Sequence, residues 1–407
     1  MKKTTCILVL IIFMLTMNAA GEVAQDLTFE AQIQIKNGGY SKRFVWDRNV
    51  DTGVKLDKTA DPWILIETPE NTPSAAVYIE FGSVILPFTV QFEENGKWTD
   101  VVSWQGDYAQ VYLPYPPNNK VRLFFDTDHR YTPLDIRELF VYSEGETDAS
   151  NVHAWAPQLK KSDLLVLVAH PDDELLWLGG ILPYYAGEKQ MNVTVAYLTC
   201  SKYTRRLELL NGLWHCGVHN YPEIGSFPDV KSYSTYDLYM KWGGITNVDL
   251  YVTRLLRRYK PEVVVTQALD GEYGHAAHMI CPDTLARAVD LAADKSFDVQ
   301  SIEQFGLWQV KKLYVHKAVD NIPSTVMNWR QPLSYFNGKT AFDIAEEAYR
   351  FHASQPQTPV NNGKAFFYVV PEDEENSSAI FTLYKSTVGE DEQGGDLFEH
   401  IDRLSGL

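Results

Sequence analysis

Short runs in which apolar and polar residues alternate fill the first third of the chain, from residue 27 to residue 142. Successive side chains of a strand point to opposite faces, so this pattern predicts half-buried β-strands. Turn sequences that favour hairpins, such as Asn37-Gly38-Gly39 and Asn95-Gly96, separate the runs. We therefore predict an N-terminal β-sandwich. Its expected strands are 29–35, 63–66, 76–81, 88–92, 111–113, 121–125 and 136–142.

The pattern changes after segment 143–151, whose small and acidic residues lack periodicity and have the composition of a surface linker. Beyond it, apolar runs typical of buried strands alternate with stretches of helical periodicity. Such alternation predicts an α/β fold with a mainly parallel sheet. We place the two domains at 22–145 and 152–407. In the second domain the predicted strands are 164–169, 193–199, 263–266 and 312–316, and the predicted helices are 203–216, 248–259, 277–292 and 341–352.

Residues 1–21 have the pattern of a secretory signal peptide. Lys2 and Lys3 precede an apolar run at 6–17, and small residues suited to cleavage follow it. The run is shorter than the ~20 residues that cross a bilayer, which argues against a membrane anchor. No later stretch is long and apolar enough to span a membrane. We therefore expect an exported protein, located in the periplasm, outside the cell or on its surface.

The chain is acidic, with a formal net charge of −17 at pH 7. Such a surface repels phosphate backbones, so we exclude nucleic acid as a partner. Beyond the predicted signal peptide the cysteines are Cys200, Cys216 and Cys281, an odd number in a compartment that permits disulfides. At least one thiol must stay free, and this is no disulfide scaffold. The sequence does not indicate an oligomeric state.

Polar side chains follow two predicted strands of the second domain. His170, Asp172 and Asp173 come directly after strand 164–169, and a histidine-containing cluster at 272–278 comes soon after the third strand. In open α/β sheets, ligands bind in the crevice outside the carboxyl ends of the strands. We therefore expect the two clusters to meet across one cleft.

Zinc prefers histidine nitrogen and carboxylate oxygen, and a catalytic zinc ion takes three protein ligands plus a water molecule. His170 and Asp173 lie three residues apart and can both reach one ion, with either His275 or His278 as the third ligand. Asp172 is the remaining acid beside this site. A carboxylate in that position is a candidate general base.

Hydrolysis of an amide also needs a group that stabilises the oxyanion and a group that protonates the leaving amine. Tyr273 and His275 are donors of the right kind. Two roles are open for Arg205. It can hold a substrate hydroxyl or phosphate, or it can simply pair with Glu208. For His316, inside an apolar strand, and His352, on a helix, we predict structural roles.

Several motifs occur together between about residue 162 and residue 355. They are Ala169-His170-Pro171-Asp172-Asp173-Glu174, Gly179-Gly180, Thr199, Arg205-x-x-Glu208, Asp270, Gly274-His275-x-x-His278 and the helix 345–355. This segment resembles the N-acetylglucosaminyl-phosphatidylinositol de-N-acetylase (PIG-L, or LmbE-like) family. The resemblance implies a Rossmann-like fold without a nucleotide site, since no Gly-x-Gly-x-x-Gly follows the first strand.

The resemblance also implies roles for single residues. His170, Asp173 and His278 would be the zinc ligands, Asp172 the base, and His275 the acid or oxyanion stabiliser. Two positions depart from the family pattern. Ala277 stands where many relatives have Asp, which leaves Glu272 or another acid to partner His275, and Cys200-Ser201 replaces a turn that often contains glycine.

The first domain has a looser resemblance. A strand that contains Trp63, the sequences 77–81, 96–98 and 121–123, and a closing strand at 136–142 follow one another in the order found in discoidin-like (coagulation factor 5/8 type C) domains. Domains of that kind often bind glycans. The segment is therefore either a glycan-binding module or a purely structural accessory domain.

These features favour an exported, zinc-dependent amidase that removes the acetyl group from an N-acetylated amino sugar or glycan. The alternative is a glycan-binding protein of the cell envelope whose second domain is silent or hydrolyses an ester. Three candidate ligands and a spare carboxylate argue against a silent site. The sequence names neither the sugar nor the group attached to it.

Overall fold

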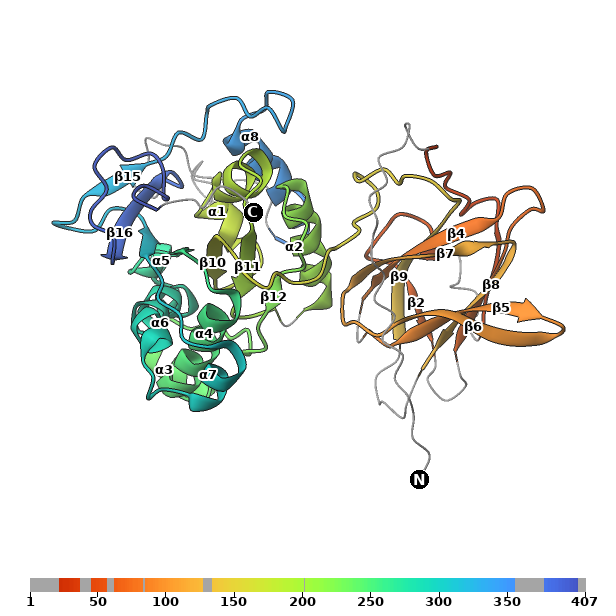
Figure 1. Ribbon diagram of the computed structural model, residues 1–407, viewed down its shortest axis with the longest axis horizontal. Helices are drawn as coiled ribbons and strands as arrows, with labels where there is room; N and C mark the ends of the chain where they lie inside the picture. Colours follow the sequence, from red (N-terminus) through yellow and green to blue (C-terminus); the bar gives the residue numbers. More distant parts are fainter. Residues whose placement is uncertain are drawn as a thin grey trace.

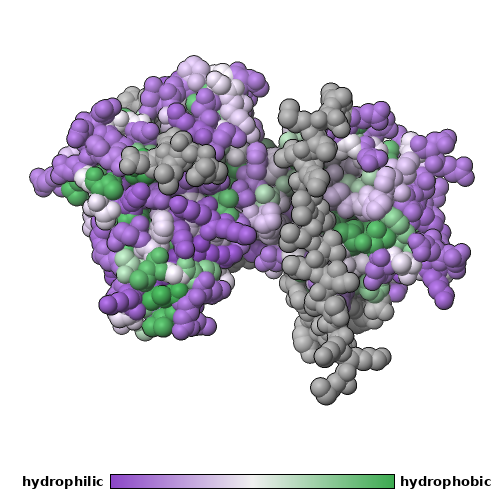
Figure 2. All heavy atoms as spheres, in the orientation of Figure 1, coloured by the Kyte–Doolittle hydropathy of each residue, from purple (hydrophilic) through white to green (hydrophobic). Residues whose placement is uncertain are grey.

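The computed structural model describes residues 22–36, 45–56, 62–82, 85–126, 134–200, 202–355 and 377–401. The predicted signal peptide and the turn Asn37-Gly38-Gly39 lie outside these residues. Within them the strands form three sheets, two antiparallel sheets early in the chain and a mixed sheet later (Figure 1). No helix in the described ranges is long and apolar enough to cross a membrane. On the face that Figure 2 shows, most of the surface is hydrophilic.

The early part of the chain contributes two antiparallel sheets. Their strands are β1 Gln32–Ile35, β2 Val54–Leu56, β3 Trp63–Glu67, β4 Ser74–Phe81, β5 Phe88–Glu94, β6 Lys97–Trp104, β7 Gln110–Asn118, β8 Lys120–Phe125 and β9 Leu134–Tyr142. One sheet has the order β1-β3-β8-β5-β6 and the other the order β2-β9-β4-β7. Alternate residues such as Ile64, Leu123 and Ile79 are buried in one apolar cluster that both sheets share. Two sheets on one core are the elements of the predicted sandwich, and the domain boundary at 143–151 stays a prediction.

The later part contains a seven-stranded sheet with the order β12-β11-β10-β13-β14-β16-β15. Its strands are β10 Leu164–Val168, β11 Val193–Tyr197, β12 Glu223–Ile224, β13 Val263–Thr266, β14 Lys312–His316, β15 Ser324–Val326 and β16 Ile380–Ser386. The strands from β12 to β14 in this order are parallel, whereas β16 pairs antiparallel with both β14 and β15. The predicted parallel centre is therefore confirmed, and the sheet as a whole is mixed.

Helices cover both faces of this sheet (Figure 1). They are α1 Asp173–Leu176, the π-helix η3 Pro183–Glu188, α2 Tyr203–His215, α3 Thr235–Lys241, α4 Ile245–Tyr259, α5 Gly271–Gly274, α6 Ala276–Ala293, α7 Val299–Phe305 and α8 Ala341–Tyr349. Leu165 and Leu167 pack with α4 and α6, whereas Val166 and Val168 pack with α1, α2 and α8. A strand covered on both faces is apolar throughout, which explains the continuous run that predicted β10.

The sheet order brings the two polar clusters together. β10 lies between β11 and β13, and Leu167 of β10 pairs with Thr266 of β13. Because the two strands are parallel neighbours, the chain leaves both at the same edge of the sheet. The loop at 169–174 and the segment 267–278 therefore start side by side.

Direct contacts join the early sheets to the later part of the chain. The rings of Tyr108 and Tyr221 stack with centroids 3.9 Å apart. Gln110 Nε2 donates a hydrogen bond to Asn211 Oδ1 at 2.6 Å, and Gln110 Oε1 accepts one from Trp155 Nε1 at 2.8 Å. Helix α2 carries Asn211 and therefore lies between the early sheets and the polar clusters.

Candidate active site

The loop after β10 holds its acidic residues in a fixed arrangement. The backbone N–H of His170 donates to Asp173 Oδ2 at 2.8 Å, and Trp177 Nε1 donates to Asp173 Oδ1 at 3.2 Å. Asp172 has a φ of 105°, and Glu174 Oε2 accepts from its backbone N–H at 3.1 Å. A positive φ is costly for a residue with a Cβ, and such strain gathers at functional sites. The loop therefore presents Asp172 and Asp173 in different directions.

Three predicted metal ligands converge beyond this loop. His170 Nδ1 lies 3.1 Å from Asp173 Oδ2 and 3.2 Å from His278 Nε2, and His278 Nε2 lies 3.3 Å from Asp173 Oδ1. All three side chains are buried. Two imidazoles and one carboxylate are a donor set that suits zinc, and donors around a tetrahedral zinc ion lie about 3.3–3.5 Å apart. The residues present therefore fit a divalent metal ion.

His275 lies beside the same cluster. The ligating atoms of His170, His275 and His278 lie within 4.8 Å of one another, so His275 is a further possible ligand. Its ring centroid is 4.9 Å from each of the other two rings. Burial and the neighbouring imidazoles lower the pKa of His275 to about 4. Its buried Nδ1 has no hydrogen-bond partner in the described part of the chain.

Glu272 holds His278 in place. His278 Nδ1 donates to Glu272 Oε2 at 2.9 Å, which leaves Nε2 facing Asp173. Glu272 Oε1 lies 3.1 Å from His316 Nδ1 and accepts from the backbone N–H of Ala268 at 2.7 Å. Carboxylates commonly fix the tautomer of a metal-binding histidine in this way. Glu272 therefore partners His278 and His316, whereas we had considered it as a partner for His275.

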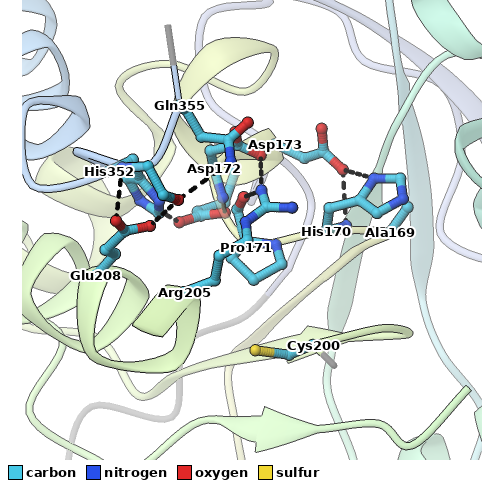
Figure 3. Close-up of polar contacts among 12 residues, drawn as sticks. Ala169, His170, Pro171, Asp172, Asp173, Cys200, Arg205, Glu208, His352 and Gln355 are labelled. Atoms are coloured by element: carbon cyan, nitrogen blue, oxygen red, sulfur yellow. Dashed lines mark hydrogen bonds and ion pairs between the residues drawn. The ribbon is translucent and has the colours of Figure 1, made fainter. Parts of the chain in front are cut away.

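Asp172 points toward Arg205 and away from the contact between His170 and Asp173 (Figure 3). Arg205 Nη2 lies 3.0 Å from Asp172 Oδ1 and also donates to the carbonyl of Pro171. Burial raises the pKa of Asp172 well above its usual range, and Arg205 opposes this rise. The pKa of Asp173 moves the other way, because His278 and His170 outweigh the effect of its burial. Two adjacent carboxyl groups in such different environments suit a base beside a ligand.

Arg205 does not form the expected pair with Glu208. Glu208 instead accepts hydrogen bonds from the backbone N–H and the hydroxyl of Ser354, each at 2.7 Å. Arg205 points to Asp172, as Figure 3 shows, and its Nη1 lies 3.9 Å from Asp229. Its predicted role in substrate binding stays a prediction.

Tyr273 lies at the rim of the site. Its side chain is 48% exposed, and its ring centroid is 5.1 Å from that of His278 and 5.8 Å from that of His275. Partial burial and the nearby carboxylates raise the pKa of Tyr273 above its usual range. The hydroxyl therefore stays neutral and can donate a hydrogen bond at any physiological pH.

Three residues near the site were missing from the predicted set. Asp229 Oδ1 lies 3.8 Å from His170 Nε2, and Gln267 Oε1 accepts from the backbone N–H of Ala169 at 2.9 Å. His352 is fully buried with Nε2 3.9 Å from Glu174, so its structural role includes supporting this loop. Gln267 directly follows β13, and this position is the signal that could have identified it. Asp229 lies in a loop without a pattern.

The cysteines of the described ranges, Cys200, Cys216 and Cys281, are all free. This confirms the expectation of a free thiol. Burial raises the pKa of Cys200 to about 11, and the neighbouring arginines oppose the rise only in part. A thiol with such a pKa is a poor nucleophile at neutral pH. Burial therefore keeps the Cys200 thiol protonated at neutral pH.

Known proteins resemble the part of the chain that carries this site. Residues 165–289 match the model of the family described as GlcNAc-PI de-N-acetylase, PIG-L. A 1D-myo-inositol 2-acetamido-2-deoxy-alpha-D-glucopyranoside deacetylase 1 from Frankia alni is 29% identical over 202 residues, which are 41% of this chain and 67% of that protein. The protein of the same description from Catenulispora acidiphila is 25% identical over 181 residues, 37% of this chain and 54% of that protein.

Among solved structures, N,N'-diacetylchitobiose deacetylase from Pyrococcus horikoshii is 17% identical, with a TM-score of 0.34 over 49% of this chain and 73% of that one. The chain thus spans between about half and three quarters of the length of these three proteins. The matched family segment contains both polar clusters, from the His170 loop to the His278 helix. Through residues 165–289, the chain is similar to the GlcNAc-PI de-N-acetylase (PIG-L) family.

Proposed function

We propose that this protein is a zinc-dependent amidase that removes the acetyl group from an N-acetylated amino sugar or glycan. The observation that carries the proposal is the convergence of His170, Asp173 and His278, whose donor atoms lie 3.1–3.3 Å apart. Asp172 lies next to them and takes no part in the convergence. The deacetylases among its relatives support the same reaction type.

His170, Asp173 and His278 would hold the metal ion. A bound zinc ion would polarise the acetyl carbonyl and lower the pKa of water at the site. Glu272 keeps His278 Nε2 directed at the cluster through the 2.9 Å contact with Nδ1. The burial of the three side chains excludes bulk water, which strengthens every electrostatic interaction among them.

Asp172 is the general base of the proposed reaction. Its carboxylate would accept a proton from the attacking water and pass that proton to the leaving amine. Burial raises its pKa above the usual range of a carboxyl group, which makes the carboxylate a stronger base. Arg205, 3.0 Å away, holds the carboxylate in position and opposes this rise in its pKa.

His275 and Tyr273 are the hydrogen-bond donors for the oxyanion. An imidazole whose pKa is about 4 is neutral at pH 7 and carries one N–H. A neutral imidazole suits a donor to the oxyanion better than a proton donor to the amine. Tyr273 reaches the same space from the rim with a hydroxyl that stays protonated.

We also propose that the protein acts outside the cytoplasm, on the strength of the signal-peptide pattern at 1–21. The direct test of function is acetate release from a panel of N-acetylated monosaccharides and oligosaccharides, with and without a chelator. Chelator-sensitive release of acetate, restored by zinc, supports the proposal. Release of acetate from O-acetylated sugars but not from N-acetylated sugars would instead indicate an esterase.

A further inference from the structure

A second pocket lies between the early sheets and helix α2. Its volume is about 350 Å³. Strands β4 and β9 form one wall through Glu80 and Glu138, and α2 forms the opposite wall through Asn211 and Trp214. Ligand pockets for small molecules have volumes of about 300–1,000 Å³. The pocket is therefore large enough for one sugar ring, and none of the predicted site residues lines it.

Two carboxyl groups face this pocket. Glu80 and Glu138 are directly opposed on neighbouring antiparallel strands, so both side chains lie on the same face of the sheet. Glu80 Oε1 accepts hydrogen bonds from Tyr78 at 3.0 Å and from Gln110 at 2.9 Å. Glu138 is 2% exposed, the backbone N–H groups of Arg48 and Asn49 are directed at its carboxyl group, and no described side chain donates a hydrogen bond to either of its oxygens.

Among the described residues no lysine or arginine side chain pairs with Glu138, although Arg48 lines the same pocket. The Arg48 guanidinium pairs with Asp26 at 2.7 Å and lies over the ring of Phe140, 4.7 Å from its centroid. Buried polar groups are almost always partnered, and each exception calls for an explanation. Of the two carboxyl groups, Glu80 alone accepts hydrogen bonds from the side chains of Tyr78 and Gln110. The two opposed carboxyl groups therefore suit a ligand that carries a positive charge.

The walls of the pocket favour an organic cation over a metal ion. Trp214, Phe351 and Phe140 contribute aromatic rings, and Asn211 and Asn151 contribute amides. Calcium binds through oxygen ligands alone, so the aromatic rings of this pocket would contribute nothing to its binding. Aromatic faces attract ammonium groups and pack against the apolar side of a sugar ring. Amides pair with hydroxyl groups in both directions.

We propose that this pocket binds an amino sugar that carries a free primary ammonium group, with the ammonium at Glu138 and the ring against Trp214. We infer the ligand class from the residues of the pocket alone. The binding proposal is therefore independent of the proposed activity. If the chain does remove acetyl groups, this ligand belongs to the class of its products. The pocket would then hold the deacetylated part of a glycan.

Helix α2 connects this pocket with the candidate active site. Arg205 in its first turns lies 3.0 Å from Asp172, and Trp214 near its end lines the pocket. Their separation of nine positions corresponds to about 14 Å along a helix that rises 1.5 Å per residue. A glycan chain that occupies the pocket would therefore be held near the chemistry without taking up the catalytic groups.

The test measures the binding of glucosamine, N-acetylglucosamine and glucose to the full mature chain by calorimetry. We expect glucosamine to bind at least tenfold more tightly than the two neutral sugars. Glu138→Gln should weaken glucosamine binding at least tenfold, and Glu138→Asp, which keeps the carboxyl group, should retain part of it. Glu94→Gln, the same change on an exposed end of β5, should leave binding as in the unmodified protein.

His170→Ala separates this pocket from the candidate active site. If the proposal holds, His170→Ala protein binds glucosamine as tightly as the unmodified protein. Loss of binding in His170→Ala with full binding in Glu138→Gln would place the amine at the active site and overturn the proposal. Equal binding of the three sugars, no saturable binding of glucosamine, or its displacement by calcium chloride would overturn it as well. The thermal midpoint of Glu138→Gln verifies that this variant is folded.

Discussion

Glu272 accepts a hydrogen bond from His278 Nδ1 at 2.9 Å, and this contact decides which nitrogen of His278 faces Asp173. The same carboxylate also reaches His316, on the neighbouring strand β14. Glu272 has a positive φ of 58°, so the backbone bends to bring its side chain to the two rings. Through its contacts with His278 and His316, Glu272 thus links the ends of β13 and β14 to the candidate metal site.

Glu272→Gln is expected to weaken zinc binding by about 10- to 100-fold, because loss of such a partner leaves the ligand misoriented and less basic. Competition with a chelator of known affinity measures the change. Glu94→Gln is the matched control, since Glu94 lies at the exposed end of β5. Unchanged zinc affinity in Glu272→Gln would show that His278 is not a ligand or needs no partner.

Arg205→Met distinguishes positioning of the base from binding of the substrate. Because Arg205 contacts Asp172 at 3.0 Å, we expect kcat to fall by roughly 10- to 100-fold with little change in KM for a small N-acetylated sugar. Arg206→Met, one residue further along α2, is the control and should keep both constants. A rise in KM alone would instead support the predicted contact between Arg205 and the substrate.

Glu138→Gln should stabilise the protein more at pH 8 than at pH 5. Burial raises the pKa of Glu138 from 4.5 to about 8, so the folded chain retains a proton that the unfolded chain releases. Stability is therefore lost as the pH rises from 4.5 to about 8 in the unmodified protein, and glutamine removes this loss.

After allowance for water in the pocket we expect a gain of about 1 kcal/mol at pH 8, or about 2–4 °C in the thermal midpoint. The measurement is the midpoint of both proteins at the two pH values, with Glu94→Gln as control. The same difference at pH 5 and pH 8 would mean that Glu138 titrates normally in the folded state.

The sequence predicted those features that one strand or helix determines by itself. β10 and β13 appear as apolar runs, and the histidine and aspartate residues at their ends meet because parallel neighbours end at one edge. β6 was missed because it is an edge strand whose side chains are mostly exposed, which removes the alternation. Asp229 and the contact between Glu272 and His316 were missed because contacts between residues far apart in the sequence leave no periodic signal.

The pocket at Glu138 was beyond sequence analysis for a related reason. The strand 136–142 was predicted, but its pairing with β4 and the approach of α2 are properties of the tertiary structure. From the sequence alone, a glutamate in a strand is predicted to face solvent. The sequence does not show that a helix covers this face. Only the assembled structure shows that Glu138 is buried and that no side chain in the described ranges donates to it.

The most direct test of the account is to measure zinc content and acetate release together in four variants, His170→Ala, Asp173→Ala, His278→Ala and Asp172→Asn. A ligand and a base fail differently, since loss of a ligand empties the site and loss of the base leaves it assembled but inactive. We expect about one zinc ion per chain in the unmodified protein and in Asp172→Asn, and a clearly lower zinc content in the three ligand variants. Acetate release should fall in all four. Metal-free Asp172→Asn protein, or a ligand variant with full zinc content, would contradict the assignment.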